Sequence, residues 1–213
     1  MTKLMRRFKA KGFTLIELLV VIAIIAILAA VLTPTVTDAL TRGKMTGTLS
    51  NGRSIFQALF AKDIEDPIFQ SGSAYPRNTG ALPIYQNSTD FWKYVVTAAV
   101  MRVNTSFFSA PGVPPPVSTN MADFKAENNA WSVSANLSDS TIDMTPLLFT
   151  KNLDVATLTA NTDYSGSLTE NPPFGRKGLP TIMKGGSGLI FKPETLNANF
   201  YTGATNITVL RPE

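Results

Sequence analysis

Histidine and cysteine are both missing from the 213 residues of this chain. Without histidine there is no Ser-His-Asp triad and no imidazole metal ligand. Without cysteine there is no thiol nucleophile, no thiolate metal site and no disulfide. The chain must therefore be held together by its own hydrophobic core. The lack of cysteine leaves the compartment open, because the cytosol and an exported disulfide-free protein both permit it.

Acidic residues are absent from the first twelve positions, which contain five of the 19 lysines and arginines. The whole chain has a formal net charge of +4, so removing these five cations leaves −1 for residues 13–213. The sequence pI of about 9.4 thus comes from a short basic leader. Global basicity is then no indication of nucleic-acid binding.

An apolar run covers residues 13–32, interrupted only by Thr14 and Glu17. As a helix it would be about 30 Å long, which matches the hydrocarbon thickness of a bilayer. Because the basic leader precedes it and the next cation is Arg42, the positive-inside rule places the amino terminus in the cytoplasm and the remainder across the membrane. A secretory signal peptide and an ordinary single-pass anchor are the alternatives.

Glu17 lies five residues into this run, where an ionised side chain costs roughly 2.5–3.5 kcal/mol on insertion scales. One interpretation is that the carboxylate snorkels to the interface or is protonated. The other is that it meets a positive partner when subunits associate. A candidate partner is the free amino group that cutting the chain before Phe13 would create in a neighbouring molecule. Such a pair would neutralise the carboxylate and fix the axial offset of the two molecules.

The sequence of residues 11–21 resembles the amino-terminal segment of type IV prepilins and type II secretion pseudopilins. That family has a short basic leader ending in Gly, then Phe, then a Thr-Leu-Ile-Glu stretch that opens a long apolar helix. The resemblance implies that a prepilin peptidase cleaves between Gly12 and Phe13, that Phe13 is N-methylated, and that Glu17 is the family's acidic position. It also implies that Pro34 is a helix-perturbing proline. It covers about the first 35 to 60 residues.

Beyond Pro34, which should kink or loosen a helix locally, we expect a helix from about Thr37 to about Asp63. Its apolar side chains recur at helical spacing and should pack against a globular domain. They are Met45, Leu49, Gly52, Phe56 and Leu59, widened by Ile55, Phe60 and Ile64. A spine helix continuous with the apolar run is what a pilin-like fold shows. A separate helix joined by a Thr-rich linker is the alternative.

The rest of the chain predicts a second, short helix and a surface loop. The helix should cover residues 90–101, with Ser88 or Thr89 as its cap. Its buried side would consist of Phe91, Tyr94, Val95 and Ala98. The proline-rich residues 111–116 predict a rigid extended loop, either a spacer or a ligand for a proline-recognising partner.

Several short strands are expected in the last third. Trp131, Val133, Ala135 and Leu137 alternate with Ser and Asn, which predicts a half-buried strand. Residues 145–153 form an apolar element of undefined type. Residues 185–188 predict a turn into a strand over 189–192, and a last strand is expected at 206–210 with 199–201 as its candidate partner. The fold class is thus α+β and pilin-like, with a long spine helix packed on a small antiparallel sheet.

Catalytic motifs are not found in the sequence. No nucleophile motif is present, and residues 185–188 lack the Lys-Ser/Thr ending of a phosphate-binding loop. We predict no enzyme activity, no cofactor and no metal site. Asp139 and Asp143 are too few for a calcium loop signature, although some major pseudopilins bind calcium in their carboxy-terminal loop. The candidate nucleic-acid cluster is Arg176, Lys177, Lys184 and Lys192, and a solvated charged face explains these residues as well.

The function that the sequence favours is a structural subunit of a type II secretion pseudopilus or a type IV pilus. Residues 1–12 would be a cleaved leader, 13–34 a transmembrane and filament-core helix, 35–65 its amphipathic continuation, and 66–213 a periplasmic or extracellular domain. The chain would be a single-pass protein of the bacterial inner membrane before it joins a filament. The alternatives are a minor tip pilin that binds DNA or a surface ligand, and a membrane-anchored enzyme.

The implied partners are other pilins or pseudopilins, a prepilin peptidase and methyltransferase, an inner-membrane assembly platform, and membrane lipid before assembly. Nucleic acid is not an expected partner of the main interpretation. Within the family, adhesive and DNA-uptake pilins often have a disulfide-bonded loop. The absence of cysteine therefore favours a pseudopilin.

Overall fold

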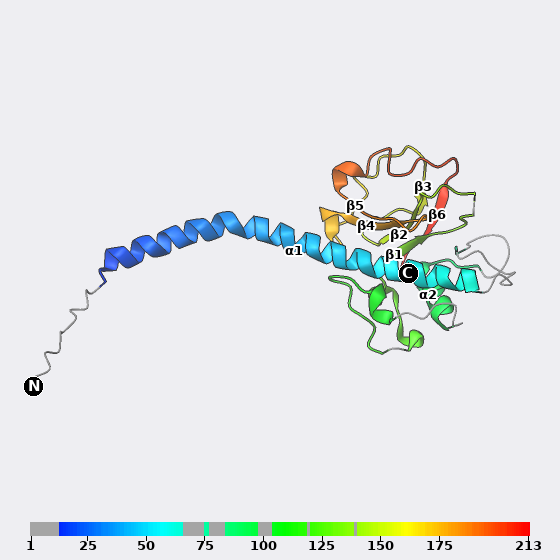
Figure 1. Ribbon diagram of the computed structural model, residues 1–213, viewed down its shortest axis with the longest axis horizontal. Helices are drawn as coiled ribbons and strands as arrows, with labels where there is room; N and C mark the ends of the chain where they lie inside the picture. The colour runs from blue at the N-terminus through cyan, green and yellow to red at the C-terminus, as the bar shows by residue number, and fades with distance from the viewer. Residues whose placement is uncertain (1–12, 66–74, 77–83, 98–103, 119, 139) are drawn as a thin grey trace, which may run out of the picture. The chain divides into compact units, whose positions relative to one another are not determined.

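The computed structural model describes residues 13–65, 75–76, 84–97, 104–118, 120–138 and 140–213 (Figure 1). The chain divides into two compact units, Met1–Thr41 and Arg42–Glu213. The described part of the first unit is helical from Leu15 onward. The second contains the end of that helix, a short helix and a six-stranded sheet. The predicted α+β, pilin-like layout of a long apolar helix followed by an antiparallel sheet is confirmed.

Helix α1, Leu15–Glu65, is a single helix of 51 residues that includes Pro34. The alternative of a separate helix behind a Thr-rich linker is therefore wrong. The threonines satisfy their hydroxyls within the helix: Thr33 donates to the carbonyl of Ala29 at 2.7 Å, and Thr37 donates to that of Thr33 at 2.8 Å. Such bonds to the preceding turn let polar residues occupy a helix without a polar partner elsewhere.

In the second unit, the predicted apolar stripe of α1 is confirmed. Its buried members are Met45, Leu49, Gly52, Ile55 and Leu59. Ile55, which is completely buried, has a more central place than Phe56, which is half-buried. The side chain of Ile64 lies outside the described ones. Helix α1 ends two residues beyond the predicted Asp63.

The sheet has the strand order β3-β6-β1-β2-β4-β5, and every neighbouring pair is antiparallel. The strands are β1 Trp131–Ser134, β2 Pro146–Thr150, β3 Thr157–Leu158, β4 Leu179–Met183, β5 Gly188–Phe191 and β6 Ile207–Leu210. Three short 3-10 helices lie between α2 and β1, namely η1 Thr105–Phe108, η2 Met121–Asp123 and η3 Ala126–Asn128, while η4 Gly175–Lys177 precedes β4 and η5 Pro193–Thr195 follows β5. The predicted strands at 189–192 and 206–210 are confirmed as β5 and β6, and the undefined element at 145–153 is β2.

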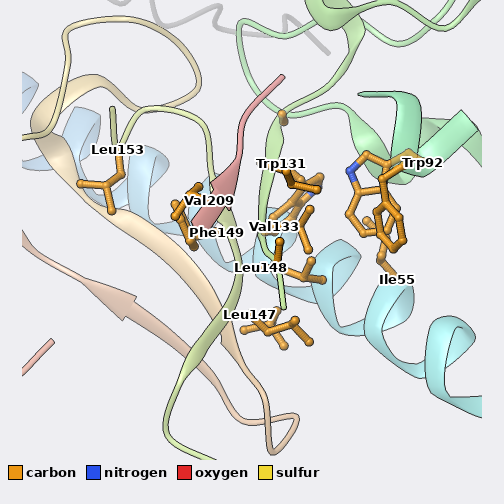
Figure 2. Close-up of a cluster of buried hydrophobic side chains, with 14 of the residues drawn as sticks. Ile55, Trp92, Trp131, Val133, Leu147, Leu148, Phe149, Leu153 and Val209 are labelled. Carbon is orange, nitrogen blue, oxygen red and sulfur yellow. The ribbon is translucent and has the colours of Figure 1, made fainter. Parts of the chain in front are cut away.

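The core lies between α1 and one face of the sheet. Gly52 allows α1 to lie close to the sheet, because a Cβ at this position would lie 2.6 Å from the Trp131 ring and 3.1 Å from Ile182. Figure 2 shows Ile55 of α1 facing Trp92 and the strand residues. Leu148 pairs with Val133 across β1 and β2 and so lies on the same face.

The strand predicted from Trp131 onward is present as β1, but the other face of the sheet is also covered, so the expected half-burial is wrong. All four residues of β1 are buried. Segments after β2, β3 and β5 supply the covering side chains, which are Leu153, Leu168, Leu196, Phe200 and Tyr201. Phe200 contacts Phe191 of β5 with ring centroids 5.0 Å apart. Ser134 is accommodated because its hydroxyl donates to the carbonyl of Pro146 at 2.6 Å.

Helix α2, Ser88–Thr97, corrects the predicted cap. The Asn87 side chain accepts a hydrogen bond from the backbone N–H of Asp90 at 2.8 Å, whereas Ser88 and Thr89 lie inside the helix and are buried. Asn87 is half-buried, and asparagine is among the residues most strongly preferred at this cap position.

The buried side of α2 also differs from the prediction. Phe91 and Val95 are buried as expected, but Tyr94 is 43% exposed and Trp92 takes its place in the core. The predicted Ala98 and the rest of the expected helix to 101 lie outside the described residues. The ring of Trp92 packs against that of Phe108 in η1, with the ring centroids 5.2 Å apart and the planes tilted.

Three more expectations are corrected. Strand β6 pairs with β1 and β3 and not with residues 199–201. Strand β4 was not predicted, and it contains Pro180, a residue that is disfavoured in central strands. The loop at 111–116 is not extended at its start, because Ala110 and Val113 exchange two backbone hydrogen bonds around a turn in which Gly112 has φ +82°.

Candidate functional site

The first turn of α1 is closed by a reciprocal pair of hydrogen bonds between Thr14 and Glu17. One carboxylate oxygen of Glu17, Oε2, accepts from the backbone N–H of Thr14 at 2.8 Å and from its hydroxyl at 2.7 Å. The backbone N–H of Glu17 donates to the Thr14 hydroxyl at 3.3 Å. Thr14 precedes the helix and Glu17 is its third residue, which is the arrangement of a capping box. The carboxylate also lies at the positive end of the helix dipole.

The second carboxylate oxygen of Glu17, Oε1, has no hydrogen-bond or ion-pair partner within the described part of the chain. An open hollow of about 380 Å³ lies beside this carboxylate. Its lining residues, besides Glu17, are Phe13, Ile16, Val20 and Val21. The site therefore offers one free anionic acceptor on an otherwise apolar surface. An amine could bind there in two ways at once, through charge and through apolar contact.

Sequence reasoning missed the role of Thr14. The signal was present, because a Thr followed three residues later by Glu at the start of an apolar run is the pattern of a capping box. The contact matters for the site because it holds the carboxylate at one place on the helix.

The apolar side chains of α1 in the first unit are exposed, with no covering partner among the described residues of that unit. Its large exposed hydrophobic residues are Phe13, Leu15, Ile16, Leu18, Leu19, Val20, Val21, Ile22, Ile24, Ile25, Ile27, Leu28, Val31, Leu32, Val36 and Leu40. The helix segment Leu15–Ala61 is long and apolar enough to cross a membrane. The most apolar stretch of 18 residues in this segment has a mean hydropathy of 3.2, and none of its residues is buried within the chain. The length and composition fit anchoring in the inner membrane.

The other predicted site residues are placed only in part. Phe13 is the first described residue and is 79% exposed, and Gly12 lies outside the described residues. Pro34 lies inside α1, where it lacks the N–H that would otherwise bond to the carbonyl of Ala30. A kink at Pro34 and cleavage between Gly12 and Phe13 stay predictions.

Two neighbouring hollows in the second unit, of about 290 and 510 Å³, share Lys151 and Asn171 as lining residues. Burial lowers the pKa of Lys151, and the nearby Glu127 carboxylate acts in the opposite direction. Its ammonium donates to the carbonyl of Ala126 at 3.2 Å. Arg211 pairs with Asp154 at the edge of the smaller hollow. The mixture of both charges does not select one class of ligand.

The candidate calcium and nucleic-acid residues have other partners. Asp143 lies 3.4 Å from the buried Lys184 ammonium, and Asp139 is outside the described residues. No group of three or more acidic residues suited to a metal ion occurs in the part of the chain that the structure describes. In the predicted basic cluster, Arg176 pairs with Glu170 at 3.2 Å and Lys192 with Glu194 at 3.7 Å.

Comparison with known proteins identifies the segment that contains this site. Residues 7–33 match the family model described as the prokaryotic N-terminal methylation motif. Neither a curated protein nor a solved structure was found to match the chain. The matched segment includes the predicted cleavage junction, Phe13, Glu17 and most of the exposed apolar helix.

The family defined by this motif is structural and not enzymatic. Its members are processed precursors, and the apolar helix fits their anchoring in the inner membrane. Residues 7–33 are thus the prepilin-type cleavage and methylation segment, which indicates a precursor of the type IV pilin or pseudopilin kind.

Proposed function

We propose that this chain is a structural subunit of a type II secretion pseudopilus or a type IV pilus and has no enzymatic role. Residues 1–12 would be removed as a leader, 13–34 would form the membrane and filament-core helix, and 35–65 would continue it into the globular part at 66–213. Processing would consist of cleavage between Gly12 and Phe13 and N-methylation of Phe13. The working subunit is then a polymer building block.

The observation that carries this proposal is the apolar surface of α1 within and just beyond the methylation motif. Its side chains are exposed in the single chain, so they need lipid before assembly and neighbouring helices afterwards. Exchanging lipid for other helices gains little hydrophobic free energy, because lipid tails are as apolar as leucine. A polar contact is therefore needed to set the order and the offset of the subunits.

Glu17 supplies that polar contact in the proposal. Cleavage before Phe13 creates a new amino group but leaves the amide N–H of Thr14 intact, so the capping box survives processing. Oε2 stays bound to Thr14, and Oε1 remains available for the Phe13 amine of a neighbouring subunit. In a region of low dielectric, an ion pair with good geometry compensates each charge for its lost hydration.

The proposed topology puts the leader in the cytoplasm and the carboxy-terminal domain in the periplasm, as the charge asymmetry across the apolar run favours. A prepilin peptidase with methyltransferase activity, an inner-membrane assembly platform and other pilins or pseudopilins would be the protein partners. Between pseudopilus and pilus, the absence of cysteine favours the pseudopilus, because disulfide-bonded loops are frequent in the family's adhesive and DNA-uptake pilins.

Intact-mass and amino-terminal analysis of the full chain extracted from membranes of its native host tests the proposal. We expect a chain that begins at N-methylated Phe13. A mature chain that still contains the basic leader, or that begins downstream of Ala30, would contradict it. The second outcome would instead indicate an ordinary secretory signal peptide.

A matched pair of variants tests whether cleavage depends on the residue at the junction itself, with a nearby substitution as the control for expression. Gly12→Val places a branched side chain at the junction and is expected to leave the leader attached. Ala10→Val adds the same kind of bulk two residues earlier, where processing should continue. Equal processing of both variants would mean that the junction is not where we place it.

A further inference from the structure

Three segments that are far apart in the sequence meet at Gly178. A Cβ on this glycine would lie 3.0 Å from the sulfur and terminal methyl of Met45 on α1, and 3.2 Å from the carbonyl oxygen of Phe191 at the end of β5. All three residues belong to the second unit, Arg42–Glu213. The chain is therefore packed tightly at this point, with no room for a side chain on residue 178.

Each of the three segments has a cation next to the contact. Lys44 precedes Met45, Lys177 precedes Gly178, and Lys192 follows Phe191. Two further cations are close in the sequence: Arg42 lies about one helical turn before Met45, and Arg176 directly precedes Lys177. We call the set of Arg42, Lys44, Arg176, Lys177 and Lys192 the basic collar. All five side chains are exposed.

The basic collar is incompletely neutralised. Glu170 pairs with Arg176 and Glu194 with Lys192, and all four side chains of these pairs are more than half exposed. Exposed pairs of this kind contribute little and remain open to other ions. The collar members without an ion pair in the described residues are Arg42, Lys44 and Lys177. Since residues 42–213, which make up the whole unit, have a net charge of only +1, this local excess of positive charge is not a general property of the unit.

Two members of the basic collar, Arg42 and Lys44, directly follow the apolar stretch in the sequence. Leu40 is the last large exposed apolar residue of α1, and the second unit begins at Arg42. The ten residues from Leu32, the end of the apolar run, to Arg42 make about 15 Å of helix, and the lipid headgroup layer takes up about 5–7 Å of that length. The length left between the headgroups and Arg42 is about one Debye length at physiological salt, so the attraction is not fully screened. Asp38 lies four residues before Arg42 in the sequence and only partly offsets the collar.

We propose that the basic collar binds the phosphate groups of anionic phospholipids on the membrane surface at which α1 emerges. The proposal rests on the membrane insertion that the proposed function requires. Lipid is the partner that the position favours, because the collar follows an apolar span directly and basic residues beside such spans are attracted to anionic headgroups. The collar would hold the globular unit at the membrane until the subunit is extracted into a filament.

The test uses the full chain in lipid vesicles. Because the chain contains no cysteine, Gly47→Cys gives a unique labelling site, and a Cβ at position 47 has no neighbour within 4 Å. A fluorophore on this residue is quenched by headgroup spin-labelled lipid according to its depth. We expect quenching to rise about twofold when about a third of the lipid is changed from zwitterionic to anionic, and to fall back at about 1 M salt.

A matched pair of double variants identifies the residues responsible. Lys44→Glu with Lys177→Glu should abolish the response to anionic lipid. Lys93→Glu with Lys125→Glu changes the same amount of charge outside the collar and should leave the response intact. Unchanged tryptophan fluorescence checks the fold. If the glutamate variants fail this check, Lys44→Gln with Lys177→Gln replaces them.

The proposal is overturned if quenching is the same in both vesicle types, or if the collar variant responds like the native chain. Salt-dependent binding of a labelled DNA duplex that needs the collar, without a response to lipid, would overturn it in favour of a nucleic-acid surface. A chain that is washed from the vesicles by alkaline carbonate would contradict membrane insertion, and with it both this proposal and the proposed function. An inserted chain that ignores anionic lipid contradicts the collar alone.

Discussion

Helix α1 has two different environments on either side of Thr41. In the first unit, its large apolar residues from Phe13 to Leu40 are exposed, whereas in the second unit Met45, Ile55 and Leu59 are buried against the sheet. The secondary structure is the same in both. The difference is that the apolar surface is covered within the chain in the second unit and is left exposed among the described residues of the first.

This comparison separates the two properties that sequence changes can disturb. Changes in the first unit should affect association with lipid or other subunits and leave the folding of the second unit unaltered. Changes in the second unit should affect its stability first. Both tryptophans, Trp92 and Trp131, are completely buried in the second unit, so their fluorescence reports on its unfolding alone.

The largest effect is expected for Glu17→Ala. It removes the free carboxylate oxygen and also the capping box with Thr14, so filament assembly should be lost by more than about tenfold while membrane insertion continues. The yield of sheared filaments and resistance to carbonate extraction measure the two properties. Asp38→Ala removes an acid from the same helix outside the apolar run and should assemble normally. Normal filaments from Glu17→Ala would refute the role of this residue in assembly.

Ile55→Ala should lower the free energy of unfolding of the second unit by about 2–5 kcal/mol, because it creates a cavity between α1 and the sheet. Ile25→Ala is the same change at an exposed position of the same helix and should leave that free energy unaltered. Denaturant unfolding of the full chain in mild detergent, followed by tryptophan fluorescence, measures both. Equal destabilisation by the two variants would mean that the units do not behave separately.

Gly52→Ala and Gly47→Ala should change stability in opposite directions. At position 52 the added Cβ meets the Trp131 ring, and overpacking costs about 1–3 kcal/mol. At position 47 it meets nothing, so the better helix propensity of alanine should stabilise the unit by up to about 1 kcal/mol. Denaturant unfolding followed by tryptophan fluorescence measures the stability of both variants. A stabilising Gly52→Ala would show that α1 can move away from β1 at little cost.

The smallest effect is expected at the start of α2. Asn87→Ala removes the side chain that accepts from the Asp90 N–H and should cost about 1 kcal/mol. Gln86→Ala alters the preceding exposed residue and should stay within about 0.5 kcal/mol of the native chain. If both variants unfold at the same denaturant concentration, the hydrogen bond at Asn87 contributes nothing measurable to the stability.

The sequence predicted most where a single element decides the pattern. The apolar run, the helical stripe from Met45 to Leu59 and the turn before β5 could all be found because spacing along one segment determines which side chains share a face. Glu17 could be singled out because a charge within an apolar run is costly on its own.

The failures occurred where a second element changed the outcome. The covering loops buried both faces of β1, which the alternation of residues 131–137 did not reveal. Trp92 is buried and Tyr94 is exposed, because Trp92 packs against Phe108 of η1, a contact that the helix period alone does not indicate. Strand β4 formed despite Pro180, since it is paired on both sides by β2 and β5.

The sequence alone therefore determined the apolar helix, the basic leader before it and the position of Glu17 within it. The leader and Glu17 can be read from local composition, and the helix from its apolar residues and the 3.6-residue period. Only the tertiary structure decided that the segments containing Lys44, Lys177 and Lys192 meet, since Gly178 packs against Phe191 and against Met45, which is more than a hundred positions away in the sequence. It also decided which apolar side chains are satisfied within the chain. Burial depends on what each surface contacts, and the sequence of one segment does not contain its partner.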